Sequence, residues 1–136
     1  MSASYYDLLD MATNMGVFVD FDDVGWLPAD HKGGWFPQYD LVLLREGLSH
    51  VEQLCTLAHE LGHVHHGHTP GAVGWWSTRQ ELQADRFAAR LLVSPVEYEA
   101  VERLYGPSIC GLAHELGVTR RVVEVWRKMF ISQPNT

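Results

Sequence analysis

Ala58-His59-Glu60-Leu61-Gly62-His63 is the stretch around which the rest of the chain is organised. It contains the motif H-E-x-x-H, whose two histidines are four residues apart. Residues at that spacing lie on one face of a helix, so His59 and His63 can both present a ring nitrogen to one metal ion. Glu60 lies one residue further round, where its carboxylate can reach a water molecule on the same ion. Two imidazole ligands and a carboxylate base are the groups that a zinc hydrolase needs.

The residues around the motif predict an amphipathic helix. Apolar side chains recur among the histidines at helical spacing, as in a helix with one face in the core and one on the site; they are Leu54, Leu57, Ala58 and Leu61. Gly67 provides a stop at the C-terminal end. Cys55 lies one turn before His59 on the metal face, where a sulfur ligand is conceivable. A small buried hydrophobic residue is the better interpretation of this cysteine.

A zinc site of this kind needs a third protein ligand and an open position for water. Segment 77–85 supplies a candidate, because Ser77 and Gln80 predict a capping box that opens a second helix. Glu81 and Asp85 share one face of that helix, and we assign Glu81 as the third ligand. Asp85 is expected to accept the free N–H of a ligand histidine and so fix its tautomer. Without the upstream motif, these two acids would be interpreted as a solvated helix face.

Further histidines follow the motif at positions 65, 66 and 68. His66 is seven residues after His59 and returns to the same helix face, so we expect it to contact the ligand shell or to bind metal adventitiously. His65 and His68 are expected to face solvent. The longer motif H-E-x-x-H-x-x-G-x-x-H is not met, because position 66 is His and position 69 is Thr. The third ligand is therefore not expected in this segment.

Length and composition indicate one globular domain. The 136 residues are 46% hydrophobic and 11% aromatic, which is enough for a core. No apolar run of about 18 residues predicts a membrane span, and the N-terminus lacks the features of a signal peptide. Two cysteines make no disulfide framework, so a cytoplasmic location is expected. The formal net charge of −7 argues against non-specific nucleic-acid binding by the whole chain.

Upstream of the motif, the sequence predicts one helix and a small sheet. The helix is expected over 4–15, with Ser4 as its cap and Gly16 as its stop. Three β-rich segments then predict an antiparallel sheet of about three short strands, at 17–21, 33–36 and 40–45. A sheet edge beside a metal helix can hold an extended peptide by strand addition. His31, in the loop at 28–34, is expected to be solvated.

Downstream of the motif, a connector at 70–76 contains two tryptophans, and its role as a lid or as a pinned loop stays open. The second helix is expected over about 78–93, and Ser94-Pro95 ends it. A third helix over about 95–105 has an apolar face made of Val96, Ala100, Val101 and Leu104. We predict a metallopeptidase core at 1–95 and a C-terminal helical segment at 96–136 that packs on it.

Within that C-terminal segment, residues 108–130 predict a unit similar to a helix-turn-helix. Its basic residues form a local positive surface, namely Arg120, Arg121, Arg127 and Lys128. DNA binding through this unit would be one interpretation. Because the whole chain is acidic, we favour packing or docking of a protein partner.

Two segments in tandem resemble a known family. They are T-L-A-H-E-L-G-H at 56–63 and E-L-Q-A-D-R-F-A-A-R-L-L-V-S-P at 81–95. Together they resemble the ImmA/IrrE metallopeptidases, which implies an α+β, mostly helical, minimal zincin-like fold. The resemblance also implies that His59, His63 and Glu81 hold one zinc ion and that Glu60 is the base. Gln83 stands where members of the family often carry a second acid.

The resemblance further implies a substrate. Members similar to this chain occur in bacteria, phages and mobile elements, where they cleave helix-turn-helix repressors. The sequence thus predicts a cytoplasmic zinc endopeptidase, although iron or manganese would also accept the ligand set. Four side chains are candidates for the oxyanion donor: Tyr39, Tyr98, His66 and His114.

Two other functions compete with the peptidase. The first is a zinc-stabilised module that controls a repressor by binding it without cleavage, since metal binding also stabilises folds. The presence of Glu60 favours the enzyme, because a purely structural site has no use for a base. The second is a DNA-binding regulator that uses residues 108–130 and binds duplexes in a salt-dependent way.

Overall fold

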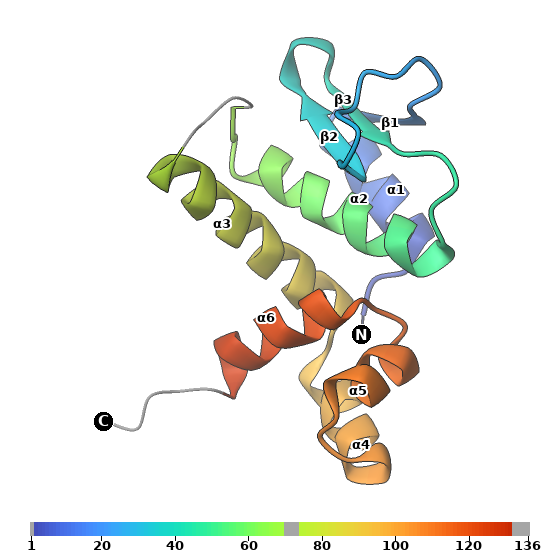
Figure 1. The fold of residues 1–136 in the computed structure, drawn as a ribbon, viewed down its shortest axis with the longest axis vertical. Coiled ribbons are helices and arrows are strands. Elements are labelled where there is room, and N and C mark those ends of the chain that lie inside the picture. Colours follow the sequence, from blue (N-terminus) through green and yellow to red (C-terminus); the bar gives the residue numbers. More distant parts are fainter. Residues whose placement is uncertain (1, 70–73, 132–136) are drawn as a thin grey trace.

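The computed structural model describes residues 2–69 and 74–131, in which a small sheet lies at one end of a mostly helical molecule (Figure 1). The N-terminal half contains α1 (Tyr5–Asn14), β1 (Phe18–Phe21), β2 (Gly33–Phe36), the 3-10 helix η1 (Pro37–Tyr39), β3 (Leu41–Leu44) and α2 (His50–His65). The C-terminal half contains α3 (Trp75–Leu92), α4 (Pro95–Tyr105), α5 (Ile109–Leu116) and α6 (Arg120–Phe130). The predicted α+β class is confirmed. Within the described residues, no helix is long and apolar enough to cross a membrane.

The sheet is mixed rather than antiparallel. Its strand order is β1-β3-β2, with β3 antiparallel to β2 and parallel to β1. The prediction is therefore correct for one pair and wrong for the other. The short link through η1 returns β3 antiparallel to β2, and β3 inserts between strands that the loop 22–32 holds apart. As the most buried strand, β3 takes the central position, while β1 is largely exposed.

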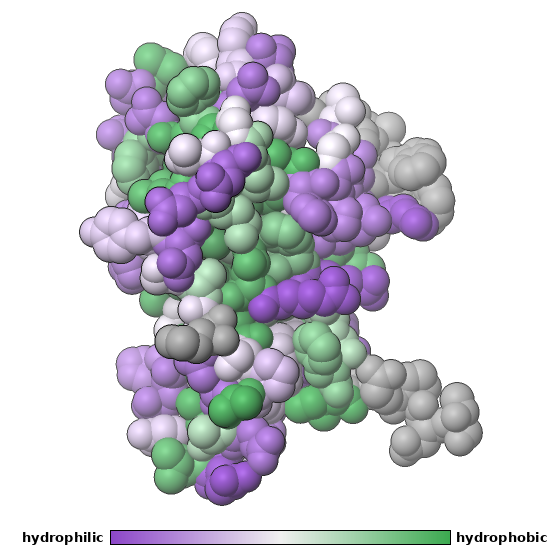
Figure 2. Space-filling model, turned by 180° about the vertical axis from the view of Figure 1, so that it is seen from behind, coloured by the Kyte–Doolittle hydropathy of each residue, from purple (hydrophilic) through white to green (hydrophobic). Residues whose placement is uncertain are grey.

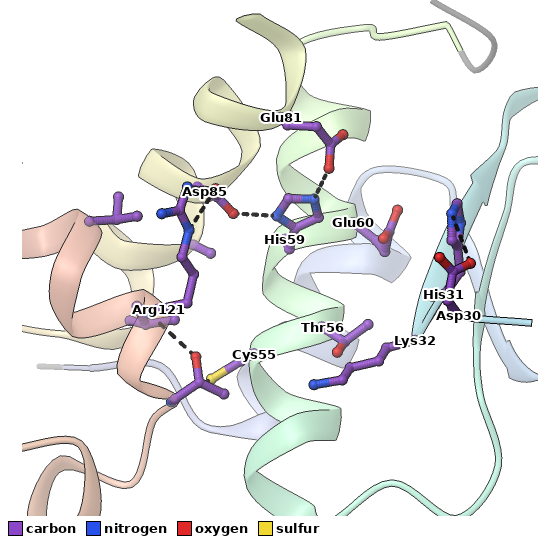
Figure 3. Close-up of a pocket in the computed structure, with 15 residues that line it drawn as sticks. Asp30, His31, Lys32, Cys55, Thr56, His59, Glu60, Glu81, Asp85 and Arg121 are labelled. Carbon is purple, nitrogen blue, oxygen red and sulfur yellow. Dashed lines mark hydrogen bonds and ion pairs between the residues drawn. The ribbon is translucent and has the colours of Figure 1, made fainter. Parts of the chain in front are cut away.

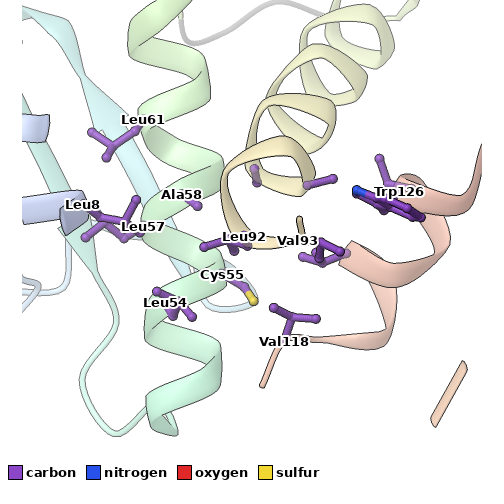
Figure 4. Packing of buried hydrophobic residues seen from close by; sticks show 14 of the residues in the cluster. Leu8, Leu54, Cys55, Leu57, Ala58, Leu61, Leu92, Val93, Val118 and Trp126 are labelled. Atoms are coloured by element: carbon purple, nitrogen blue, oxygen red, sulfur yellow. The ribbon is translucent and has the colours of Figure 1, made fainter. Parts of the chain in front are cut away.

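Helix α2 is the centre of the core and lies beside the sheet, α1 and α3 (Figures 1 and 4). The predicted apolar face is confirmed, since Leu54, Leu57, Ala58 and Leu61 are all buried. Cys55 is buried as well, and its Sγ accepts a hydrogen bond from the N–H of Thr119 at 3.4 Å. The interpretation of Cys55 as a small hydrophobic residue is thus confirmed. Burial also raises the pKa of its thiol.

Local signals decide most helix ends. Ser4 caps α1 as predicted, and α2 ends just before Gly67, whose φ is +65°. The predicted capping box of Ser77 and Gln80 is wrong, because α3 already begins at Trp75. The N–H of Thr78 donates to the carbonyl of Gly74 at 3.1 Å, which closes the first helical turn before Ser77 can act as a cap. Most of the predicted connector, 70–73, lies outside the described residues.

Helices α4, α5 and α6 occupy the predicted ranges, but α4 buries a different face. Val96 and Leu104 are 78% and 77% exposed, whereas Tyr98 is buried. Tyr98 stacks on Trp126 of α6 with ring centroids 4.3 Å apart, so a partner distant in sequence determines which face packs. Seen from behind, the molecule exposes apolar residues through its middle and at the lower end, where α4 and α5 lie (Figure 2). Helix α6 packs on α3, and the division into two parts at residue 95 stays a prediction.

The contact between α2 and α3 is unusually close at Gly62. A Cβ atom at this position would lie 2.9 Å from the Cα and 3.0 Å from the carbonyl oxygen of Ala84, and 3.1 Å from the Cβ of Phe87. Only glycine fits without moving the backbone of α3. Because glycine weakens a helix interior by about 1 kcal/mol relative to alanine, its presence here is explained by this close approach.

We predict that Gly62→Ala separates α2 from α3 and destabilises the metal-free protein. Overpacking of this kind costs about 1–3 kcal/mol, measured as a loss in the free energy of unfolding in urea. Gly111→Ala is the matched control, because a Cβ there meets only ordinary contacts at 3.7 and 3.8 Å. This control should be neutral or more stable by up to about 1 kcal/mol. Equal stability of the two variants would contradict the role of the close contact.

Candidate metal centre

Three side chains from two helices converge on one point. The Nε2 atoms of His59 and His63 lie 3.2 Å apart on α2. The carboxylate of Glu81 on α3 reaches both: its Oε1 lies 3.1 Å from His59 Nε2 and its Oε2 lies 2.8 Å from His63 Nε2. Within the described residues, these three form a group whose ligand atoms could hold a metal ion. The structure thus brings together the three residues that the sequence nominated as ligands.

The spacing of these atoms fits a small tetrahedral ion. Zinc bonds to nitrogen and oxygen are about 2.0–2.1 Å long, so two ligand atoms at a tetrahedral angle lie about 3.3 Å apart. The two Nε2 atoms lie 3.2 Å apart, and each lies at 3.1 or 2.8 Å from a different oxygen of Glu81, so this carboxylate must turn one oxygen toward the ion to act as a single ligand. The donor set of two imidazoles and one carboxylate is also one that zinc accepts and that leaves a fourth position open.

Asp85 orients the ring of His59 from the far side, as the sequence predicted for this residue (Figure 3). Its Oδ1 lies 2.9 Å from Nδ1 of His59, and its Oδ2 accepts a hydrogen bond from Arg121 of α6 at 2.9 Å. A carboxylate can only accept here, so Nδ1 of His59 donates and Nε2 points to the centre. The basic residue Arg121 therefore contacts the site from the C-terminal segment.

Other basic residues of the C-terminal segment also have partners within the protein. Arg127 donates to the hydroxyl of Tyr98 at 2.7 Å and to the carbonyl oxygen of Pro107. Arg120 contacts Sγ of Cys110 at 3.7 Å. These contacts favour a packing role for the basic surface over sequence reading of DNA.

A second hydrogen-bonded chain holds His63, and it was missed by the sequence interpretation. His68 was expected to face solvent, but it is buried and its Nδ1 lies 2.9 Å from Nδ1 of His63. Its Nε2 donates to Oε1 of Gln83 at 2.7 Å. In neutral rings, that leaves Nδ1 of His68 as an acceptor, so His63 donates from Nδ1 and its Nε2 lone pair is free at the centre. His66 instead stacks on His68, with centroids 5.3 Å apart.

The position of His68 follows from the way α2 ends. The N–H of His68 donates to the carbonyl of His63 at 3.0 Å, and the N–H of Gly67 donates to that of Val64 at 3.0 Å. These two bonds define a Schellman motif, in which the residue after the glycine, His68, lies next to the third-last residue of the helix, His63. A histidine directly after Gly67 was therefore the signal that could have identified His68.

Glu60 is buried beside the centre, with 7% of its surface exposed, and points toward the strand side of the site (Figure 3). Gly33 of β2 makes room for it, since a Cβ there would lie 3.3 Å from Cγ of Glu60 and 2.6 Å from Cγ2 of Thr56. Burial raises the pKa of Glu60, which brings the carboxylate closer to the range in which a base can take up and return a proton.

Cavities of about 370 and 610 Å³ flank the centre and share His31, Gly33, Glu60 and Glu81. His31 is half exposed, as expected for the loop, yet it borders both cavities. The four predicted oxyanion donors border neither cavity within the described residues; these are Tyr39, Tyr98, His66 and His114. Tyr98 is buried against Trp126 instead. The positions of these four side chains thus do not support the predicted role.

A family model of the IrrE N-terminal-like domain, Peptidase_M78, matches residues 12–125 of the chain. The chain belongs to the Peptidase_M78 family. The match includes both helices of the candidate metal centre and extends beyond the segments 56–63 and 81–95 on which the resemblance was noted, as far as α6. No curated protein matches the sequence. Membership of Peptidase_M78 points to peptidase activity, and the centre of His59, His63 and Glu81 could hold the metal ion of such an enzyme.

Metal binding to this Peptidase_M78 centre should release a proton from His59. Burial alone would lower the pKa of His59, but its hydrogen bonds to Asp85 and Glu81 raise the pKa to about 10. The ring is therefore doubly protonated at neutral pH without metal, and the ion displaces the proton on Nε2. We expect release of about one proton per zinc ion and an affinity that rises about tenfold per pH unit between pH 6 and 8.

Calorimetry in two buffers of different ionisation enthalpy measures the number of protons released. Binding that releases no proton and keeps the same affinity across this pH range would contradict the protonated state of His59.

Proposed function

We propose that this protein is a zinc-dependent endopeptidase that hydrolyses a peptide bond in a protein partner. The observation that carries the proposal is the combination of a metal-ligating triad with a buried carboxylate next to it that is not part of the triad. His59, His63 and Glu81 supply the ligand atoms, and Glu60 borders both cavities beside them. A purely structural metal site has no need of such a base.

The residues divide the work of peptide hydrolysis between them. A zinc ion bound by His59, His63 and Glu81 would lower the pKa of a water molecule and polarise the substrate carbonyl. Glu60 accepts the proton of the attacking water and returns it to the nitrogen of the leaving amine. Its burial and raised pKa suit both transfers, because the same group must hold the proton between them.

The edge of β2 supports binding of an extended peptide. In the order β1-β3-β2, strand β2 has a neighbour on one side only. The larger cavity borders the four consecutive residues Gly33–Phe36. Side chains alternate between the two faces of a strand, so a cavity that touches every residue follows the edge of the strand. A peptide along this edge would pass directly by Glu60.

We further propose that the substrate is a helix-turn-helix repressor of a phage or mobile element in a bacterial cytoplasm. The sequence resemblance to ImmA/IrrE proteins supports this substrate. The competing proposal, a zinc-stabilised module that binds the repressor without cleaving it, shares the ligand set and predicts no loss of function when the base is removed. A variant of Glu60 distinguishes the peptidase from the binding module.

We predict that Glu60→Gln keeps the zinc ion and loses turnover by about 10²–10⁴-fold, because the amide cannot accept the proton. The assay follows cleavage of helix-turn-helix repressors encoded beside the gene by mass spectrometry, and zinc content by native mass spectrometry. Glu115→Gln is the matched control, since the local sequence His114-Glu115-Leu116-Gly117 repeats that of the motif on an exposed helix end. Cleavage by Glu60→Gln at the wild-type rate would exclude Glu60 as the base.

We predict that His68→Phe weakens zinc binding by about 10–100-fold, because His63 loses the acceptor that fixes its tautomer. His66→Phe is the control, since that ring contacts His68 by stacking and has no hydrogen bond to His63 among the described contacts. Competition with a chelating dye measures both affinities. If the two variants bind zinc equally well, the hydrogen bond from His63 to His68 does not position the ligand.

A further inference from the structure

The larger cavity beside Glu60 is lined by two chemically different groups of residues. The polar group belongs to the candidate metal centre and includes Glu60, His63 and Glu81. A second group of lining residues is apolar and comes from the loop before β2 and from the end of that strand: Trp26, Leu27, Pro28 and Phe36. We call these four residues the Trp26 wall. The smaller cavity on the other flank of the centre is lined by charged side chains, among them Lys32 and Arg121, and by small apolar ones such as Val122 and Val125.

Trp26 is the most exposed of the wall's large hydrophobic side chains, with 50% of its surface accessible. Its ring contacts Phe36 at a centroid distance of 5.7 Å and Tyr39 at 5.6 Å. Three aromatic rings therefore cluster at the surface next to the cavity. Contiguous exposed apolar groups of this kind are typical of binding sites rather than of ordinary surface.

The loop that carries Trp26 is held rigidly from both ends. The carboxylate of Asp22 accepts hydrogen bonds from the backbone N–H groups of Gly25 and Trp26, both at 2.9 Å, and of Leu27 at 2.8 Å. At the other end, Arg45 donates to the carbonyl oxygen of His31 at 2.6 Å and also to that of Pro28. Because this wall is already ordered, it loses little conformational entropy when it binds a ligand.

Gly34 allows this wall to lie against β2. A Cβ at Gly34 would lie 2.9 Å from Cδ2 of Leu27 and 3.3 Å from Cε1 of Phe36, so a larger residue would displace both. The loop is thereby seated on one face of β2, beside the edge along which we place the peptide. A peptide bound there, with its reacting carbonyl near Glu60, has a side chain within reach of Trp26.

We propose that the Trp26 wall is a specificity site that takes one bulky apolar side chain, aromatic or long aliphatic, of the peptide substrate. This inference rests on the proposed peptidase function and names the kind of residue that the enzyme selects next to the cleaved bond. The flank with Lys32 and Arg121 has no phenylalanine, tyrosine or tryptophan among its described lining residues, so we place the preference for a bulky apolar side chain on the side of the Trp26 wall.

The test is peptide binding to zinc-loaded Glu60→Gln protein, which is disabled for cleavage. Two blocked heptapeptides of alanine and glycine are compared, one with a central phenylalanine and one with alanine in its place. We expect the phenylalanine peptide to bind about tenfold more tightly or better, because its ring is buried on the wall. Trp26→Ala should reduce this ratio below about threefold, and Trp26→Phe should restore most of it. Tyr6→Ala, which removes an aromatic side chain that is 78% exposed on α1, should leave the ratio unchanged.

Equal affinities of the two peptides, including no binding of either, would overturn the proposal, as would a ratio that Trp26→Ala leaves unchanged. Cleavage of the same phenylalanine peptide by the wild-type protein tests the peptidase function separately. Preferential binding without cleavage would refute the function and keep the apolar site. Cleavage without preferential binding would support the peptidase function and refute the apolar site.

Discussion

The structure depends on the close approach of α2 and α3 at Gly62 and Ala84. The histidines of the candidate metal centre lie on α2 and its carboxylate on α3, so the separation of the two helices sets the distance between His59 Nε2 and Glu81, which is 3.1 Å. A methyl group at Gly62 would meet the backbone of α3 at 2.9 Å. Backbone atoms cannot rotate away as side chains do, which makes this contact a strict limit on residue size.

Two hydrogen-bonded chains then orient the imidazoles from opposite sides. Asp85 and Arg121 hold His59, while His68 and Gln83 hold His63. Each chain ends on a group outside α2, so helices α3 and α6 and the turn after α2 all contribute to one centre. Their shared effect is to direct both Nε2 atoms toward Glu81. The C-terminal segment thus helps to position the site, because Arg121 holds Asp85.

The surroundings of the centre differ between its two flanks. The cavity toward α6 is bordered by charged groups and small apolar side chains, and the cavity toward β2 by the aromatic rings of the Trp26 wall. Glu60 lies between them, buried against Gly33. A peptidase with such a site would select its substrate by the side chains next to the cleaved bond, because an extended chain exposes them to both flanks in turn.

Local chemistry in the sequence was sufficient for the two histidines of the candidate centre and for most helix ends. The spacing of His59 and His63, the cap at Ser4 and the stop at Gly67 depend only on residues within one or two helical turns. The direction of β1 relative to β3, the face of α4 that packs and the burial of His68 were decided by the tertiary structure. Each depends on a contact between residues distant in the sequence, which the neighbouring residues do not predict. Examples are the stacking of Tyr98 on Trp126 and the pairing of β3 with both β1 and β2. Periodicity reports which residues can share a face, whereas packing decides which face is covered.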